Sequence, residues 1–259
     1  RELGFISTNI DLIYGLPKQT PESFAFTLQR VIELNPDRLS VFNYAHLPAR
    51  FAAQRKIRDE DLPSPVQKLA ILQESIQMLC GAGYQFIGMD HFARPQDELA
   101  VAQRNGELHR NFQGYTTQAE CDLLGLGVSA ISMLGDHYAQ NQRELKHYYA
   151  EVEAHGHALA KGLRMSDEDC LRRDVIKALI CNFQLRFADI EQQYGIDFNQ
   201  HFAEDLQLLA PLAADGLLEM DAQGIRVLPR GHLLIRNICM CFDTYLRQQA
   251  RRQQFSRVI

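Results

Sequence analysis

The chain has 259 residues, of which 46% are hydrophobic and 23% are charged, a composition typical of a globular protein with one or two domains. No run of about 18 apolar residues occurs, so we expect neither a membrane span nor a signal peptide. The formal net charge of -5 argues against a general affinity for nucleic acid.

The first pattern in chain order is a predicted strand at residues 9–14 that carries a carboxylate. Asp11 stands among Ile10, Leu12 and Ile13, and the stretch ends in Gly-Leu-Pro. A carboxylate buried without a partner is costly, so we expect Asp11 to be buried against a ligand or a tight hydrogen-bond network. Asp11 is therefore the first candidate functional residue.

Alternating helices and strands follow this stretch. The patterns predict strands at 9–14, 38–44 and 84–89, with helices at 20–35 and 65–80 between them. Short connections between such elements predict parallel pairing with right-handed crossovers, and ligands then bind at the carboxyl ends of the strands. The polar residues expected at those ends are Asp11, Asn43, Tyr44, His46, Asp90 and His91.

The segment from Arg94 to Asn141 is polar and rich in glycine, and it lacks a strong period. Its aromatic residues and its Gly-Leu-Gly run argue against disorder, so we interpret it as an ordered active-site wall. Gly125 and Gly127 allow the backbone to approach another group closely. That group is either a nucleoside or a neighbouring strand.

A second domain is predicted from residue 143 onward. Helical patterns recur through this region, and a hairpin is expected to turn at Asp221 to Gly224. Three helices with a hairpin resemble a winged helix, a module that often binds DNA. The region is acid-rich and has no basic cluster on the candidate recognition helix, which favours a packing or lid role over DNA binding.

The six cysteines show none of the paired spacings that build zinc or iron–sulfur sites. We therefore expect no self-sufficient metal site in this chain. Free thiols at unrelated positions favour a reducing cytoplasm, with most of them acting as small buried hydrophobic residues.

Five longer motifs resemble one enzyme family. They are the segments Asn9–Thr20, Phe42–Pro48, Gly88–Arg94, Arg110–Thr117 and Ile235–Asp243. Together they resemble the oxygen-independent coproporphyrinogen III oxidases, the radical S-adenosylmethionine (SAM) enzymes of haem biosynthesis. The resemblance covers essentially the whole chain, and each motif mixes polar and apolar residues in a way that folding alone would not dictate.

The resemblance implies an α/β fold. Residues 1–142 would form the C-terminal part of an incomplete radical SAM (β/α) barrel with parallel strands, together with an active-site wall. Residues 143–259 would form a mostly α-helical, winged-helix-like C-terminal domain that helps to cover the site.

The resemblance also implies two kinds of cofactor. A 4Fe-4S cluster is held in the family by a CxxxCxxC motif that is absent from this sequence, so its ligands would lie outside this chain in a longer enzyme. Two SAM molecules are expected. Asp11 and Ala45 match positions that contact the second SAM, and Ile131 matches a position that lines the cluster-bound SAM.

The implied reaction is the oxidative decarboxylation of two propionates of coproporphyrinogen III to vinyl groups by a 5'-deoxyadenosyl radical, which gives protoporphyrinogen IX. Expected partners are coproporphyrinogen III and a reduced flavodoxin-type electron donor, with no nucleic acid or membrane and a monomeric full-length enzyme. The chain alone is expected to be inactive and poorly soluble. Residues that could meet the substrate carboxylates are Arg94, Arg104, Arg110 and the tail arginines Arg247, Arg251, Arg252 and Arg257.

Two other functions remain open from the sequence. A haem chaperone-like tetrapyrrole-binding protein of the same superfamily would bind haem stoichiometrically without converting coproporphyrinogen. A winged-helix regulator would instead bind DNA through residues 166–259, and its binding would be sensitive to salt.

Overall fold

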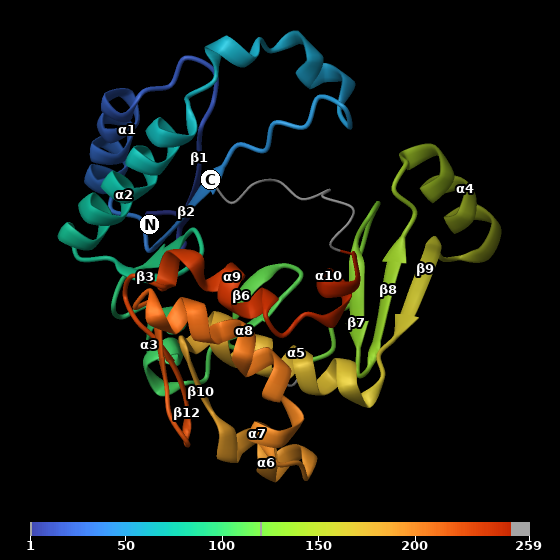
Figure 1. The fold of residues 1–259 in the computed structure, drawn as a ribbon. Coiled ribbons are helices and arrows are strands. Elements are labelled where there is room, and N and C mark those ends of the chain that lie inside the picture. Colours follow the sequence, from blue (N-terminus) through green and yellow to red (C-terminus); the bar gives the residue numbers. More distant parts are fainter. Residues whose placement is uncertain (1, 120, 250–259) are drawn as a thin grey trace. The chain divides into compact units, whose positions relative to one another are not determined.

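A computed structural model describes residues 2–119 and 121–249 of the chain. These residues form two compact units. The first contains residues up to 105 together with 244–249, and the second contains residues 106–243. Figure 1 shows the elements of both units along the chain. None of the helices in the described ranges is long and apolar enough to cross a membrane.

The first unit is built on one sheet whose strands follow the order β1-β2-β4-β3. Its strands are β1 (Asn9–Tyr14), β2 (Arg38–Asn43), β3 (Gln85–Gly88) and β4 (His91–Ala93). Its helices are α1 (Pro21–Leu34), α2 (Pro65–Gly81), α3 (Glu98–Asn105) and α10 (Thr244–Gln249), with short 3-10 turns η1 (Ala52–Lys56) and η2 (Asp59–Asp61).

The pairing in this sheet is mixed, which corrects the all-parallel prediction. β1 and β2 run parallel, as expected from the crossover helix between them. The predicted third strand does not lie beside β2, because β4 stands between β2 and β3 and runs antiparallel to both. Gly88 and Met89 have positive φ values of 144° and 57° and form the turn that reverses the chain after β3. Asp90 and His91 therefore open a return strand.

Local capping explains where α1 and α2 begin. The side chain of Thr20 accepts a hydrogen bond from the backbone N–H of Ser23, and Ser64 does the same for Gln67. A proline at the first helical position follows each cap and has a backbone angle that suits the start of a helix. The helix starts predicted at these positions are confirmed.

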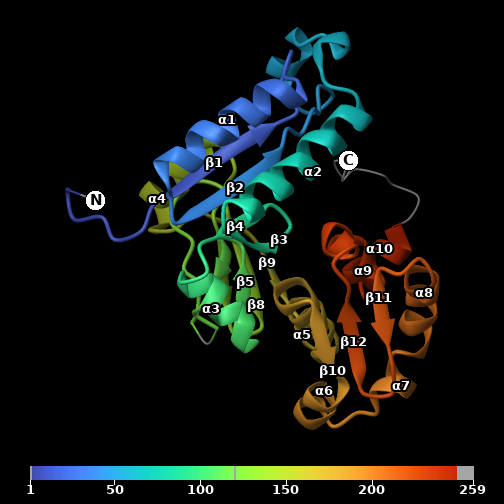
Figure 2. The same cartoon turned by 90° about the vertical axis from the view of Figure 1, so that its left-hand side faces the viewer.

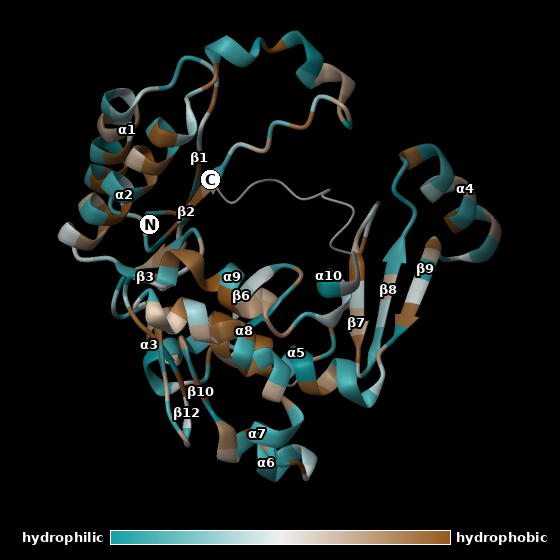
Figure 3. Ribbon diagram, viewed as in Figure 1, coloured by the Kyte–Doolittle hydropathy of each residue, from teal (hydrophilic) through white to brown (hydrophobic). Residues whose placement is uncertain are grey.

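Both helices contribute to one core against the sheet. Leu28 of α1, Leu39 and Val41 of β2, and Leu79 of α2 are completely buried in it. Hydrophobic and hydrophilic residues are mixed along α1 and α2, as expected of helices with one buried side (Figure 3). Ile10 and Leu12 of β1 pack against the same core. The residues that alternate with them along β1 therefore face away from these helices.

The second unit contains three small antiparallel sheets within its described residues. They are β5 (His109–Asn111) with β6 (Gly114–Thr116), then β7 (Ile131–Leu134), β8 (His137–Asn141) and β9 (Leu159–Arg164), and finally β10 (Gln184–Arg186), β12 (Gly224–Val227) and β11 (Leu218–Met220). Its helices are α4 (Leu145–His155), α5 (Asp167–Asn182), α6 (Phe187–Tyr194), α7 (Phe198–His201), α8 (Ala203–Ala214) and α9 (Ile235–Met240), the last preceded by the 3-10 turn η3 (His232–Leu234).

The division into units differs from the predicted domains. The predicted boundary after residue 142 falls between β8 and β9, which pair with each other along most of their length. The compact units separate at residue 106 instead. Because the β7-β8-β9 sheet joins residues on both sides of position 142, the active-site wall packs with the region that follows it.

The carboxy-terminal half of the second unit has the element order of a winged helix: α5, β10, α6, α8, β11 and β12 (Figure 2). Ser166 caps α5 in a reciprocal pair of hydrogen bonds with Asp169. The predicted hairpin is confirmed, since Asp221 accepts hydrogen bonds from the backbone N–H groups of Gln223 and Gly224 at its turn.

A chain of aromatic rings forms the core of this half. Phe198 stacks on Phe187 with ring centroids 4.1 Å apart, and it also lies 4.5 Å from Phe202. Phe202 in turn meets Phe242 edge-on at 5.6 Å. These four rings are buried and link α6, α7 and the end of α9, so this half is packed as one core.

Candidate functional site

Asp11 is exposed, which corrects the prediction that it is buried. It belongs to the side of β1 that faces away from α1 and α2, together with Asn9 and Ile13. Ile13 is 46% exposed. The sequence was misinterpreted because Ile10, Leu12 and Tyr14 alone face the core, whereas the intervening residues do not. The carboxylate accepts a hydrogen bond from Asn9 Nδ2 at 2.7 Å. The rest of its surface is exposed to solvent, where a ligand could reach it.

A row of polar residues crosses the sheet on this face. Asp11 of β1 is in register with Ser40 of β2, and Ser40 is in register with His91 of β4. The ring of His91 meets Phe42 edge-on at 5.9 Å, and its Nδ1 lies 2.8 Å from Asp90 Oδ1. Residues in register point to the same side of a sheet, so Asp11, Ser40 and His91 form one polar row. Of the six predicted polar residues, the structure brings Asp11 and His91 onto one face.

The remaining predicted polar residues lie near the ends of the strands. The Nε2 atom of His46 is 3.2 Å from Asp59 Oδ1, so this histidine is already paired within the loop after β2. Asn43 Oδ1 is buried and accepts no hydrogen bond from the residues that the structure describes. The backbone N–H of Tyr44 donates to the carbonyl of Tyr14, which extends the pairing of β1 and β2 by one residue.

Ala45 is exposed in the loop that follows β2. Its carbonyl accepts a hydrogen bond from Gln54 Nε2 at 2.9 Å, and Gln54 Oε1 accepts one from the backbone N–H of Leu47 at 2.6 Å. A single amide side chain therefore fixes the backbone on both sides of His46. The sequence did not single out Gln54, because a glutamine in a polar loop carries no distinctive pattern.

Ile131 begins β7, and its backbone is held by the glycine-rich loop. A Cβ placed on Gly125 would lie 2.7 Å from the carbonyl oxygen of Ile131, so only glycine fits at position 125. The loop is fixed further by Asn141 Nδ2, which donates to the carbonyls of Gly125 and Gly127 at 3.2 and 2.9 Å. Of the two groups that Gly125 was expected to approach, the neighbouring strand is the one that it meets.

Comparisons with known proteins agree with the five motifs. The chain is 73% identical over 259 residues to the oxygen-independent coproporphyrinogen III oxidase of Escherichia coli strain K12, a match that covers 100% of this chain and 57% of that protein. It is 49% identical over 260 residues to a protein of the same name from Thermostichus vulcanus, and covers 80% of that relative. The chain belongs to the oxygen-independent coproporphyrinogen III oxidase family.

Two further comparisons agree with this family, and the second, a solved structure, confirms the α/β fold that the resemblance implied. A family model described as HemN C-terminal domain matches residues 165–234. The solved structure of coproporphyrinogen III oxidase (HemN) from Escherichia coli, described as a radical SAM enzyme, matches with a TM-score of 0.93 at 73% identity. That match covers 95% of this chain and 56% of the solved one. The chain thus spans little more than half the length of its Escherichia coli relative.

The three residues that the coproporphyrinogen III oxidase resemblance assigns to SAM lie in both units. Asp11 and Ala45 belong to the first unit and Ile131 to the second. Their convergence on SAM remains a prediction. Among the described residues, no three His, Cys, Asp or Glu side chains are grouped so that they could share a metal ion.

The candidate carboxylate-binding arginines have different surroundings. Arg94 donates to the carbonyl of Ala82 and to the side chain of Asn35, and its guanidinium lies 3.8 Å from the ring centroid of Tyr84. Arg104 donates to Gln85 and to the carbonyl of Pro95. Both side chains are therefore used in folding. Arg110 has a buried Nε donor that is unpaired among the described residues. The tail residues Arg251, Arg252 and Arg257 lie outside the described residues.

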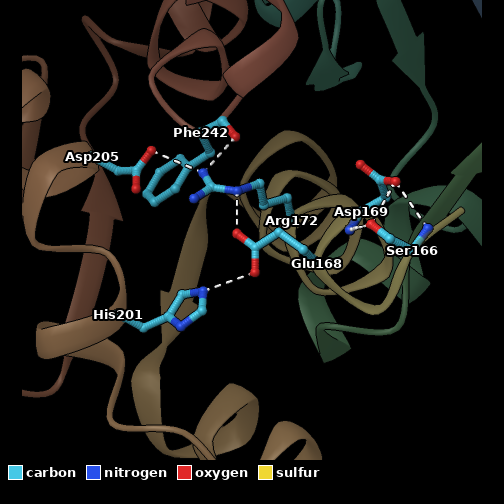
Figure 4. A network of polar contacts seen from close by, with 7 residues as sticks. All are labelled: Ser166, Glu168, Asp169, Arg172, His201, Asp205 and Phe242. Atoms are coloured by element: carbon cyan, nitrogen blue, oxygen red, sulfur yellow. Dashed lines mark hydrogen bonds and ion pairs between the residues drawn. The ribbon is translucent and has the colours of Figure 1, made fainter.

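The winged-helix-like region of this family member contains a network of charged residues (Figure 4). Arg172 of α5 donates to Glu168 at 2.6 Å, to Asp205 of α8 at 2.9 Å and to the carbonyl of Phe242 at 3.0 Å. His201 lies 2.9 Å from the second oxygen of Glu168. Asp205 is only 2% exposed. Burial lowers the pKa of Arg172, but the two carboxylates outweigh it and the net pKa is raised.

This network bears on the DNA-binding alternative. Helix α8 takes the place of a recognition helix, yet it contains Glu204 and Asp205 and no Lys or Arg. Asp205 is turned inward to Arg172. A helix of this charge is repelled by phosphate, which favours a packing role for the region.

Proposed function

We propose that this chain forms the carboxy-terminal part of an enzyme that converts coproporphyrinogen III to protoporphyrinogen IX. Each of two propionate side chains would lose carbon dioxide, one hydrogen atom to a SAM-derived radical and one electron to a separate electron acceptor, which leaves a vinyl group. The observation that carries this proposal is the 73% identity over the entire chain to an oxidase of that name. The match covers the entire chain and so includes the segments that contain Asp11, Ala45 and Ile131.

The described residues fit SAM as a ligand. Asp11 offers a carboxylate on the uncovered side of β1, which suits an ammonium group or ribose hydroxyls, and we assign it with Ala45 to a second SAM. The partly buried side chain of Ile131 suits the apolar part of a nucleoside, and we assign it to a cluster-bound SAM. Bound SAM supplies the group that removes a hydrogen atom from the substrate, with electrons from a flavodoxin-type donor.

The cysteines of this chain do not fit a 4Fe-4S cluster. Cys181 and Cys239 are buried, and burial raises the pKa of both thiols, that of Cys181 to about 12. Thiols that remain protonated are poor ligands, because iron binds the thiolate. We therefore assign the cluster ligands to residues outside this chain.

The chain's own residues would position reactants rather than carry electrons. Gln54 fixes the backbone on both sides of His46, and Gly125 fixes the start of β7. Rigid backbone at both places keeps Ala45 and Ile131 in place for binding. Preorganised contacts of this kind reduce the entropy that is lost when a ligand binds.

Product analysis with the full-length protein tests the proposed reaction. The protein is incubated without oxygen with SAM, a reductant and coproporphyrinogen III, and porphyrins are separated after oxidation. We expect protoporphyrin to accumulate. Stoichiometric haem binding without conversion would instead support the chaperone-like alternative and contradict the oxidase.

A variant of Asp11 tests its assigned role separately from turnover. Asp11→Asn keeps the shape of the side chain but removes its charge, so we expect SAM affinity to fall roughly 10-fold or more, as when a charged hydrogen bond is lost. Equilibrium dialysis with radiolabelled SAM measures the affinity. Asp215→Asn, at an exposed aspartate that ends α8, is the matched control. Equal affinity in both variants would make Asp11 a structural residue.

A further inference from the structure

Arg110 of β5 has no carboxylate partner, unlike its neighbours on α5. Its Nε atom is buried and donates no hydrogen bond to any residue that the structure describes. Among the described residues, the ion pairs of Arg172 and Arg173 each include an aspartate, whereas none includes Arg110. The one partner of its guanidinium in that part of the chain is the ring of Tyr115, whose centroid lies 5.5 Å from it.

A second cation, Lys177 of α5, lies in the same neighbourhood. β5 packs against α5, and the hydroxyl of Tyr115 donates to the carbonyl of Ile180 at 3.2 Å. Both Arg110 and Lys177 are close enough to the thiol of Cys181 to act on its ionisation. Lys177 is partly buried and forms no ion pair among the described residues. Burial and the charge of Arg173 lower the pKa of Lys177, and the charge of Asp174 offsets this only in part.

Neither Arg110 nor Lys177 forms an ion pair in the described part of the chain, and Asp174, the carboxylate that acts on Lys177, is itself paired with Arg173. Two partly buried cations in this situation are unfavourable in a folded protein. An arginine cannot relieve this by losing its proton, because its guanidinium stays charged at any accessible pH. A buried charge is normally kept only when it is paired, as Arg172 is. An anion bound from outside the chain would supply the missing charge.

We propose that Arg110 and Lys177 form a carboxylate-binding site for a propionate of the tetrapyrrole substrate. This inference rests on the proposed function, since coproporphyrinogen carries four propionates. The fork of Arg110 donates two parallel hydrogen bonds to a carboxylate, and Lys177 adds a point charge. The Tyr115 ring holds the guanidinium in place before the ligand arrives.

Binding of coproporphyrin III, the oxidised and fluorescent form of the substrate, tests this site without turnover. It is titrated into the full-length protein in the absence of reductant. We expect Arg110→Gln to weaken binding about 10- to 100-fold, the range for losing a charged hydrogen bond, and Lys177→Gln to weaken it less. Arg143→Gln, at an exposed arginine of the same unit, should bind as the wild type does.

The tetramethyl ester of coproporphyrin III shows whether the carboxylate is what the site binds. The ester has no negative charge, so wild type and Arg110→Gln should bind it equally. Unchanged coproporphyrin affinity in both variants, or an equal loss for acid and ester, overturns the proposal. A loss of SAM affinity alone also overturns it, because the carboxylate would then be that of SAM.

Two measurements distinguish a propionate site from a failed oxidase and from a folding role of Arg110. Wild-type protein that neither binds coproporphyrin nor converts coproporphyrinogen would refute the proposed function, whereas an active wild type with unaffected variants refutes only this site. The melting temperature of Arg110→Met should equal or exceed that of the wild type, because an uncompensated charge is removed. A fall of several degrees would make Arg110 a folding residue instead.

Discussion

Two arginines of the second unit have contrasting surroundings. Arg172 is enclosed by Glu168, Asp205 and the carbonyl of Phe242, and its guanidinium lies 5.1 Å from the ring of Phe202. The buried Nε atom of Arg110 donates no hydrogen bond within residues 2–119 and 121–249. Both side chains are partly withdrawn from water, so the difference lies in their partners rather than in their exposure.

The contrast distinguishes an arginine that stabilises the fold from an arginine that is available to bind a ligand. A buried cation with all its donors used holds elements together, and its removal leaves a buried carboxylate behind. A buried cation with an unused donor costs stability, and proteins accept that cost where they bind an anion. The two arginines should therefore respond in opposite ways to substitution.

The largest expected effect is that of Arg172→Met. Asp205 would remain buried and unpaired, which costs about 3–5 kcal/mol of unfolding free energy. Native-state hydrogen exchange at the slowest backbone amides of α5 measures this loss within the second unit. Arg226→Met is the control. Arg226 pairs with Glu219 at the surface, where both side chains are more than half exposed, so its loss should cost less than about 1 kcal/mol. Similar losses in both variants would refute the contrast.

Removing both charges should recover most of this loss. In Arg172→Met/Asp205→Leu no buried charge remains, and replacing a buried pair by apolar residues is often close to neutral. We expect the double variant to be at least about 2 kcal/mol more stable than Arg172→Met, by the same exchange measurement. If the double variant is no more stable than Arg172→Met, the carboxylate of Asp205 is not the source of the cost.

The smallest expected effect concerns His232, a partly buried base that can release its proton. It stacks on Phe183 with centroids 3.8 Å apart, and burial lowers its pKa below the ordinary value of 6.5. The unfolded chain binds a proton at this histidine more readily than the folded chain does. The contribution of neutral His232 to the unfolding free energy is therefore fully present above pH 6.5 and is lost as the pH falls through the folded-state pKa. His232→Phe keeps the stacking and should lose less melting temperature between pH 7 and pH 5 than the wild type. An equal loss would place the acid sensitivity elsewhere.

Local signals in the sequence predicted much of the first unit and part of the second. A helix start such as that at Thr20 and the turn at Asp221 each depend on a few adjacent residues, so the helices expected at 20–35 and 65–80 and the hairpin were predicted correctly. The three-residue strand β4 was missed, because pairing so short depends on what lies beside it. The β7-β8-β9 sheet was missed for the same reason.

The candidate site was predicted less well than the fold. Asp11 was chosen as a candidate because its neighbours in the sequence are apolar. Its exposure, however, depends on which side of β1 the helices cover. The difference between Arg110 and Arg104 is invisible in the sequence, since both are arginines in polar segments. Only the positions of carbonyl and carboxylate groups around each guanidinium separate them.

The end position of β1 in the sheet order has a practical consequence. No strand in the described part of the chain pairs with the outer edge of Asn9–Tyr14, and a bare edge accepts a further strand readily. Co-expression of this chain with a separate polypeptide that carries the rest of the relatives' length offers a split-enzyme design. If the two polypeptides reassemble at that edge, the amount of porphyrin formed would report their association.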